Sequence, residues 1–69
     1  MWTLVVESGK HKGRKVKLIS DRVVIGRAED AQIRVGSTEV SRHHCELLPS
    51  ADGVLVNDLG SANGTLVNG

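Results

Sequence analysis

The chain has 69 residues, a formal net charge of +1 and one cysteine, Cys45. This length fits a single domain, the lone thiol excludes an internal disulfide bond, and the near-zero charge argues against broad nucleic-acid affinity. There is no charged N-terminal lead and no run of about 20 apolar residues, so we expect a cytoplasmic protein without a signal peptide or membrane contact.

The apolar residues favour strands with an aliphatic core. A single Trp is the only aromatic residue, and valine dominates the remaining apolar positions. The branched Cβ of valine suits a pleated sheet better than a helix.

The first half of the chain alternates in the manner of strands. Residues 2–7 place Trp2, Leu4 and Val6 on one face, and after a turn residues 14–19 direct Val16 and Leu18 to one side. The further predicted strands are residues 22–25, 32–35, 43–48, 54–59 and 65–67. Seven short strands at a spacing of roughly ten residues predict an antiparallel sandwich or barrel, with no helix of useful length.

Three polar loops interrupt these strands, at residues 26–31, 36–42 and 60–64. Loops carry most binding residues of β-proteins, and two of these contain an arginine beside a Gly or Ser, Arg27 and Arg42. A guanidinium is a rigid fork of donors that suits phosphate oxygens. In an up-and-down arrangement, connections after alternate strands lie at the same end of the sheet, and this rule does not place the first and third loops together. A crossover connection could bring them to one end. The residues by themselves therefore indicate a β-rich binding module for an anion.

Catalysis and cofactor binding have weaker support. Ser41, either His43 or His44, and Asp58 supply the residue types of a Ser–His–Asp triad, but no Gly-x-Ser-x-Gly turn frames the serine. The glycine-rich loop at 60–64 has no Lys and lacks the spacing of a nucleotide-binding loop. We expect no catalytic residue and no cofactor.

A metal site is also a weak alternative. The consecutive His43, His44 and Cys45 alternate between two faces of a strand, so they need help, such as a loose site with His11, to reach one ion. Cys45 is better explained as a small buried hydrophobe.

Two other patterns have simple explanations. The triplet at Asn63 matches a glycosylation acceptor, but we expect no secretory signal and so treat the match as accidental. The basic run at residues 10–17 is either a nucleic-acid contact or, as we favour, a solvated hairpin whose lysines protect a sheet edge. It has no aromatic residues for base stacking.

The loop residues, taken in order, resemble a known family. The motifs are Gly26-Arg27, Ser41-Arg42-x-His44, Ser61-x-Asn63-Gly64-Thr65 and Val67-Asn68-Gly69. Each is weak alone, but their order and spacing resemble the forkhead-associated (FHA) family of phosphothreonine-binding β-sandwich modules. The resemblance covers most of the chain and implies one FHA domain over residues 1–69.

The resemblance also implies roles for individual residues. Arg27, Ser41 and Arg42 match the positions that hold the phosphate, and Asn63 matches the asparagine that hydrogen-bonds the peptide main chain. The supporting positions are Gly26, His44, Ser61, Gly64 and Thr65. His44 matches a histidine that ties loops together. Alternation along the strand would instead put His43 on the same face as Cys45, but we follow the resemblance and expect His43 to be exposed. The family's crossover gathers the three loops at one end.

The chain departs from the family in two places. Ala62 stands where many members carry a hydroxyl that touches the phosphate or peptide. The family sandwich has eleven strands against the seven predicted here, so we expect the domain to lack its C-terminal strands. A bare sheet edge would then favour association, possible dimer formation included.

The resemblance therefore implies a phosphothreonine-dependent protein-interaction module and not an enzyme. Its partner would be a protein phosphorylated by a Ser/Thr kinase, or a phosphorylated tail of the same polypeptide. Two alternatives stay open: an FHA-like scaffold that associates without phosphate, and a small nucleic-acid binder that uses residues 10–17.

Overall fold

The structure is a computed structural model that describes residues 2–7 and 9–67, and its regular elements are all β-strands. They are β1 (Trp2–Val5), β2 (Lys15–Leu18), β3 (Val23–Gly26), β4 (Ile33–Arg34), β5 (Cys45–Pro49) and β6 (Val54–Asp58). Across the described ranges, no helix is long and apolar enough to cross a membrane.

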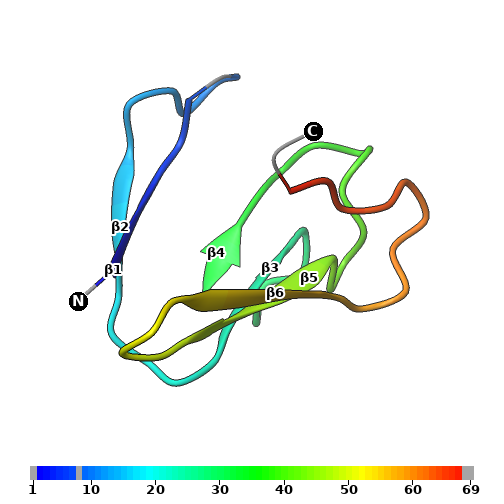
Figure 1. The fold of residues 1–69 in the computed structure, drawn as a ribbon. Coiled ribbons are helices and arrows are strands. Elements are labelled where there is room, and N and C mark those ends of the chain that lie inside the picture. The colour runs from blue at the N-terminus through cyan, green and yellow to red at the C-terminus, as the bar shows by residue number, and fades with distance from the viewer. Residues whose placement is uncertain (1, 8, 68–69) are drawn as a thin grey trace.

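These strands form two sheets, which Figure 1 shows as a hairpin beside a larger layer. β1 and β2 pair in antiparallel fashion, and the larger sheet has the order β4-β3-β5-β6. Within it, β5 is antiparallel to both β3 and β6, whereas β4 lies parallel to β3. The chain therefore leaves β3, forms the edge strand β4, and crosses back to place β5 on the other side of β3.

The core lies between the hairpin and the larger sheet. Leu18 of β2 packs in one buried cluster with Val23, Ile33 and Leu47. Half-buried side chains that surround this cluster are Leu4, Val16, Ile25, Val54 and Val56. The four residues of this cluster are aliphatic, as the composition predicts, and hydrophobic burial is what holds the two layers together.

The alternation predicted for β2 is confirmed. Val16 is half-buried and Leu18 buried, while Lys15 and Lys17 are exposed. Trp2, placed on the inner face by parity, is 42% exposed, because its indole reaches the turn after β5, where Nε1 donates to the carbonyl of Ser50 at 2.8 Å.

Some strand boundaries were predicted wrongly. Residues 65–67 do not form a strand, and β4 is two residues long where four were predicted. β5 begins at Cys45, so His43 and His44 lie before it and strand parity does not govern them. A strand exists only where a neighbouring strand supplies hydrogen-bond partners. Residues 65–67 pair with no strand in the described part of the chain.

Cys45 is 5% exposed on β5, which fits its interpretation as a small buried hydrophobe. Burial raises the pKa of its thiol above the ordinary value, so the thiol stays neutral.

Candidate functional site

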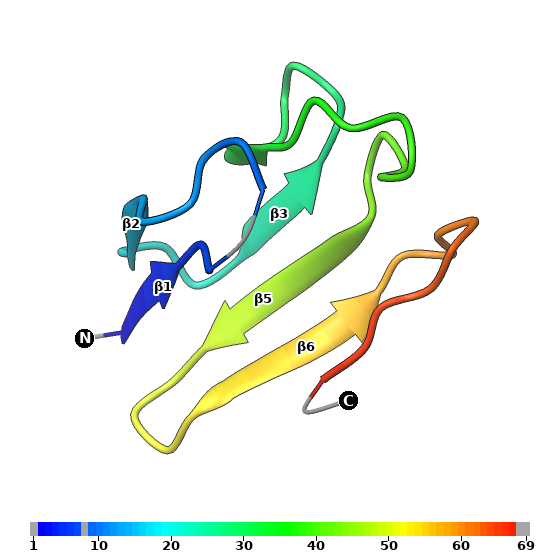
Figure 2. The same cartoon turned by 90° about the horizontal axis from the view of Figure 1, so that it is seen from above.

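The strand directions bring all three polar loops to one end of the larger sheet. β3 ends beside the start of β5, with Ile25 opposite Cys45, and β6 ends there too, with Cys45 opposite Asp58. Figure 2 shows β3 and β6 running in one direction and β5 running against them. The crossover over β4 is what makes this possible, because it lets β3 and β6 flank the same strand.

The first two loops are joined through their backbones. The N–H of Arg27 donates to the carbonyl of Ser41, and the N–H of Ala28 donates to the carbonyl of Arg42, both at 3.0 Å. At Gly26 a Cβ atom would lie 2.0 Å from the carbonyl oxygen of Arg42. Only glycine permits this close backbone approach, which places the loop that carries Arg27 beside the loop that carries Arg42.

Both arginines are exposed to solvent. The Nε of Arg27 donates to the carbonyl of Val40 at 3.1 Å, which anchors the guanidinium against the second loop. This anchoring orients the terminal nitrogens of Arg27 before any ligand arrives, and pre-organised donors lose less entropy on binding.

Ser41 joins the second loop to the third. Its Oγ accepts a hydrogen bond from the backbone N–H of Ala62 at 3.0 Å. Since the hydroxyl accepts in that bond, its own hydrogen can be donated elsewhere. Ala62 thus contributes its backbone to the site even though it offers only a methyl side chain.

His44 lies half-buried below these loops and bonds to two of them. Nδ1 accepts from the backbone N–H of Ser41 at 3.1 Å, and Nε2 lies 2.8 Å from the carbonyl of Gly64. A backbone N–H can only donate and a carbonyl can only accept, so the ring is neutral with its hydrogen on Nε2. His43 is exposed and its Nε2 lies 2.8 Å from Oδ1 of Asp30.

Asp58, at the end of β6, organises the third loop. Oδ2 accepts from the N–H groups of Gly60 at 2.9 Å and Ser61 at 3.0 Å, and Oδ1 accepts from the hydroxyls of Ser61 at 2.5 Å and Thr65 at 2.7 Å. These bonds, led by that of the Ser61 hydroxyl, lower the pKa of Asp58 to about 2. Sequence reasoning assigned Asp58 only to a triad, although an Asp followed by Gly and Ser two and three residues on is a turn signature.

Asn63 closes the third loop onto the second. Its Nδ2 donates to the carbonyl of Glu39 at 2.7 Å. Gly60 and Gly64 on either side have φ angles of 76° and 81°, a conformation that costs other residues energy. The loop is therefore held at both ends of its bend, and Asn63 reaches across the gap between loops.

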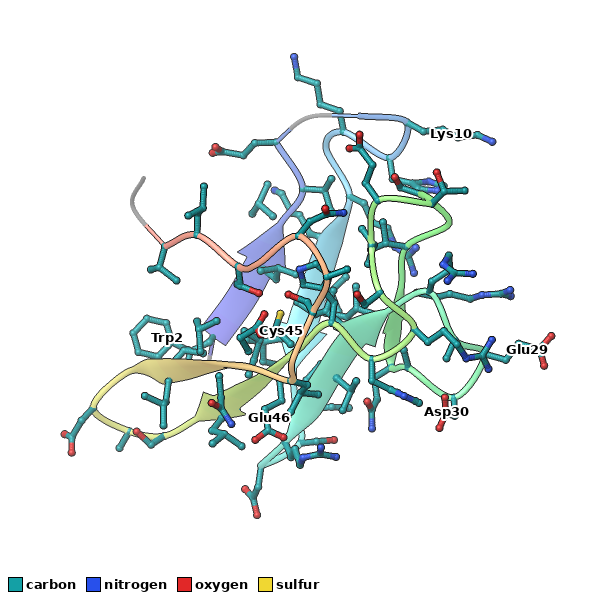
Figure 3. All side chains as sticks on the ribbon, turned by 90° about the vertical axis from the view of Figure 1, so that its right-hand side faces the viewer. Trp2, Lys10, Glu29, Asp30, Cys45 and Glu46 are labelled. Carbon is teal, nitrogen blue, oxygen red and sulfur yellow. The ribbon has the colours of Figure 1, made fainter. Side chains whose placement is uncertain are left out.

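A cavity of about 540 Å³ opens beside the first loop, and it brings in a third arginine that sequence reasoning missed. Arg27, Arg34 and Arg42 line it together with Ala28, Glu29, Asp30 and His43. Arg34 comes from β4, and its Nε donates to the carbonyl of Arg27 at 3.3 Å. Figure 3 looks onto this end of the molecule, with Glu29 and Asp30 at its margin. The hydrogen bond with His43 lowers the pKa of Asp30.

The catalytic and metal alternatives do not assemble. His44 bonds the backbone N–H of Ser41 instead of its hydroxyl, His43 lies against Asp30, and Asp58 is occupied by Ser61 and Thr65, so these residues do not form the Ser–His–Asp relay considered above. No group of three or more His, Cys, Asp or Glu side chains comes together to hold a metal ion within residues 2–7 and 9–67.

Comparison with known proteins places this arrangement in a family. The FHA domain model matches residues 23–69. The chain is 42% identical over 66 residues to the FHA domain-containing protein FhaA of Mycobacterium tuberculosis, covering 96% of the chain and 12% of FhaA. It is 38% identical over 65 residues to the oxoglutarate dehydrogenase inhibitor of Corynebacterium jeikeium, covering 94% of the chain and 45% of that protein. The chain thus spans less than half the length of these curated relatives.

Solved structures agree with the sequence matches. One, from a structural and functional study of phosphothreonine-dependent FHA domain interactions, has a TM-score of 0.84 and 42% identity, covering 96% of this chain and 67% of the solved one. A crystal structure of the FhaA FHA domain complexed with the intracellular domain of Rv3910 has a TM-score of 0.83 and 42% identity, with 96% and 70% covered. The resemblance read from the loop motifs is confirmed, and the chain belongs to the FHA domain family.

Proposed function

We propose that this chain is a phosphothreonine-dependent protein-interaction module that binds a phosphorylated segment of a protein through its three end loops. One observation carries the proposal: Arg27, Ser41, Arg42 and Asn63 belong to three loops that hydrogen-bond to one another at one end of the sheet. The phosphothreonine-dependent interactions named for a similar solved domain support it.

The chemistry of the loops fits a phosphate group. Phosphothreonine carries a charge of about −1.5 to −2 at pH 7 and three strong acceptor oxygens. In the proposed complex the guanidiniums of Arg27 and Arg42 donate to those oxygens, and the hydroxyl of Ser41 donates its remaining hydrogen. Charge-assisted bonds of this kind are about twice as strong as neutral ones, so phosphate dominates the affinity.

Asn63 would hold the peptide backbone beside the phosphorylated residue. One of its two amide hydrogens is used by the carbonyl of Glu39. The second hydrogen and the amide oxygen form a donor–acceptor pair that matches a peptide unit. The bonds from His44 and Asp58 would act indirectly, since they hold the loops that carry Ser41 and Asn63.

The proposed partner is a protein phosphorylated by a Ser/Thr kinase, or a phosphorylated tail of the same polypeptide. The complex of the similar FhaA domain with an intracellular protein domain supports a protein partner. Binding of this kind makes and breaks no covalent bond, so we propose that the chain itself is not an enzyme and needs no cofactor.

The decisive experiment is a titration of a phosphothreonine peptide library against the wild-type chain and the Arg27→Ala variant. Phosphoserine and unphosphorylated versions of each peptide are the controls. We expect binding that requires phosphothreonine and disappears in the variant. Equal affinity for phosphorylated and plain peptides would refute the proposal and favour a phosphate-independent scaffold.

A further inference from the structure

A groove of about 400 Å³ runs between the β1–β2 hairpin and the β4 edge of the larger sheet. Its walls include Val6, Val16, Ile33 and Val35, of which Ile33 is buried and the other three are half-buried. Concave, mostly aliphatic sites of roughly 300–1,000 Å³ are typical of ligand pockets. The groove has the size and chemistry to receive apolar side chains.

The rim of the groove is positively charged. Lys10, His11 and Arg14 contribute to it from the turn between β1 and β2, Arg34 contributes from β4, and no Asp or Glu of the described residues lines it. Backbone hydrogen bonds order this turn: the N–H of Val6 donates to the carbonyl of Arg14 at 2.9 Å, and the N–H of Arg14 donates to the carbonyl of His11 at 3.0 Å. Figure 3 shows Lys10 projecting from the turn beside the second site loop. An acidic ligand would complement this rim.

The groove and the proposed phosphate site adjoin at Arg34. Arg34 lines both the groove and the cavity that contains Arg27 and Arg42, and Ser37 of the second site loop lines the groove as well. A ligand whose phosphate sits between Arg27 and Arg42 therefore reaches the groove by passing Arg34.

We propose that this groove is a second subsite for the phosphorylated partner, and that it binds a segment with apolar side chains flanked by acidic residues. The inference rests on the proposed function, because adjacency to the proposed phosphate site is what assigns the groove to the same partner. A nucleic acid would use the charge of the rim but not its aliphatic walls, since duplex binding is dominated by phosphate contacts.

The test compares one short synthetic peptide with two longer ones by fluorescence anisotropy. The short one has a phosphothreonine with three residues on each side, and the long ones add five alternating glutamates and leucines at one terminus or the other. We expect one of the long peptides to bind about tenfold more tightly than the short one, because leucine burial adds to the affinity. An extension with serine in place of leucine should lose most of that gain.

Two charge-reversed variants locate the effect. The pair Lys10→Glu and Arg14→Glu should abolish the gain from the extension and leave the short peptide within about twofold of wild type, since neither residue lines the phosphate cavity. The matched control is Lys15→Glu with Lys17→Glu, which makes the same charge change at exposed positions of β2 that do not line the groove. It should retain the gain.

Several outcomes would overturn the inference. One is equal affinity of the wild type for the short and long peptides. Another is a full gain in affinity with the serine extension. The third is an equal loss of that gain in the two charge-reversed variants. Loss of duplex DNA binding in the Lys10 and Arg14 variant, with the peptide gain intact, would assign the rim to nucleic acid instead. Failure of the short phosphopeptide to bind at all would overturn the proposed function together with the subsite, whereas the other outcomes leave that function standing.

Discussion

The carbonyl oxygen of Arg42 lies 2.0 Å from the position that a Cβ atom would take on Gly26, so β3 and the loop before β5 meet through bare backbone. Both partners belong to rigid, hydrogen-bonded segments, and Ala28 completes the junction with its bond to the same carbonyl. The phosphate-binding arginines that we propose depend on this contact for their spacing.

Replacing Gly26 with alanine should therefore force the two loops apart. We expect Gly26→Ala to lower the free energy of unfolding by about 2 kcal/mol, the range for overpacking against an atom that cannot move aside, and to weaken phosphopeptide binding. Urea denaturation measures the first effect. Gly36→Ala is the matched control, since no atom lies within 4 Å of a Cβ there, and equal stability of the two variants would contradict the expectation.

Arg27 should require its guanidinium and not merely its charge. Its Nε is bonded to the carbonyl of Val40, and a lysine cannot keep that bond while presenting a planar fork to phosphate. We expect Arg27→Lys to reduce phosphopeptide affinity about tenfold by calorimetry. Arg22→Lys, at a surface ion pair with Glu46, should bind as wild type does. Undiminished binding by Arg27→Lys would point to a purely electrostatic role.

Asn63 should affect binding more than stability. We expect Asn63→Ala to lose at least about tenfold in affinity, since it removes the groups proposed to hold the peptide backbone. The matched control is Asn57→Ala, which removes an exposed amide of β6 that donates to Glu46 on β5 and belongs to none of the three loops. If both variants bind the phosphopeptide equally well, Asn63 has no contact with the ligand.

His44 should matter where its neighbour does not. His44→Ala removes the bonds to Ser41 and Gly64 that connect the second loop to the third, so we expect about a tenfold loss of phosphopeptide affinity. His43→Ala removes an exposed side chain that lines the same cavity but bonds only the exposed Asp30, so it should lose no more than about threefold in affinity. A larger loss in His43→Ala than in His44→Ala would contradict the supporting role.

Asp58 should make the third loop sensitive to acid. Its pKa falls from 3.8 to about 2 on folding, and a depressed carboxyl pKa stabilises the folded state only while the group is ionised. The stabilisation is therefore fully present above about pH 5 and is lost as the pH falls through about 4 towards about 2. The difference in Tm between wild type and Asp58→Asn should follow that course.

Asp52→Asn, at an exposed turn residue, is the control for this pH series. Its Tm should parallel that of wild type throughout. A Tm difference for Asp58→Asn that stays constant from pH 7 to pH 2 would show that the loop does not depend on the ionised carboxylate.

The sequence by itself determined which face of the longer strands is buried and which residue types the loops carry. Alternation along residues 14–19 correctly separates Val16 and Leu18 from Lys15 and Lys17, because side chains on a strand repeat every two residues whatever the partner strand is. The loop motifs that begin at Gly26 and end at Gly69 were enough to indicate the family, since their order and spacing are properties of the chain.

Only the tertiary structure decided which of these segments meet. The crossover that sets β3 beside β5, the bond from Ala62 to Ser41 and the approach of Arg34 to Arg27 are contacts that no local pattern encodes. The predicted strand at 65–67 was wrong for the same reason: a strand is stabilised by hydrogen bonds to a neighbouring strand, and the fold gives those residues none within the described part of the chain.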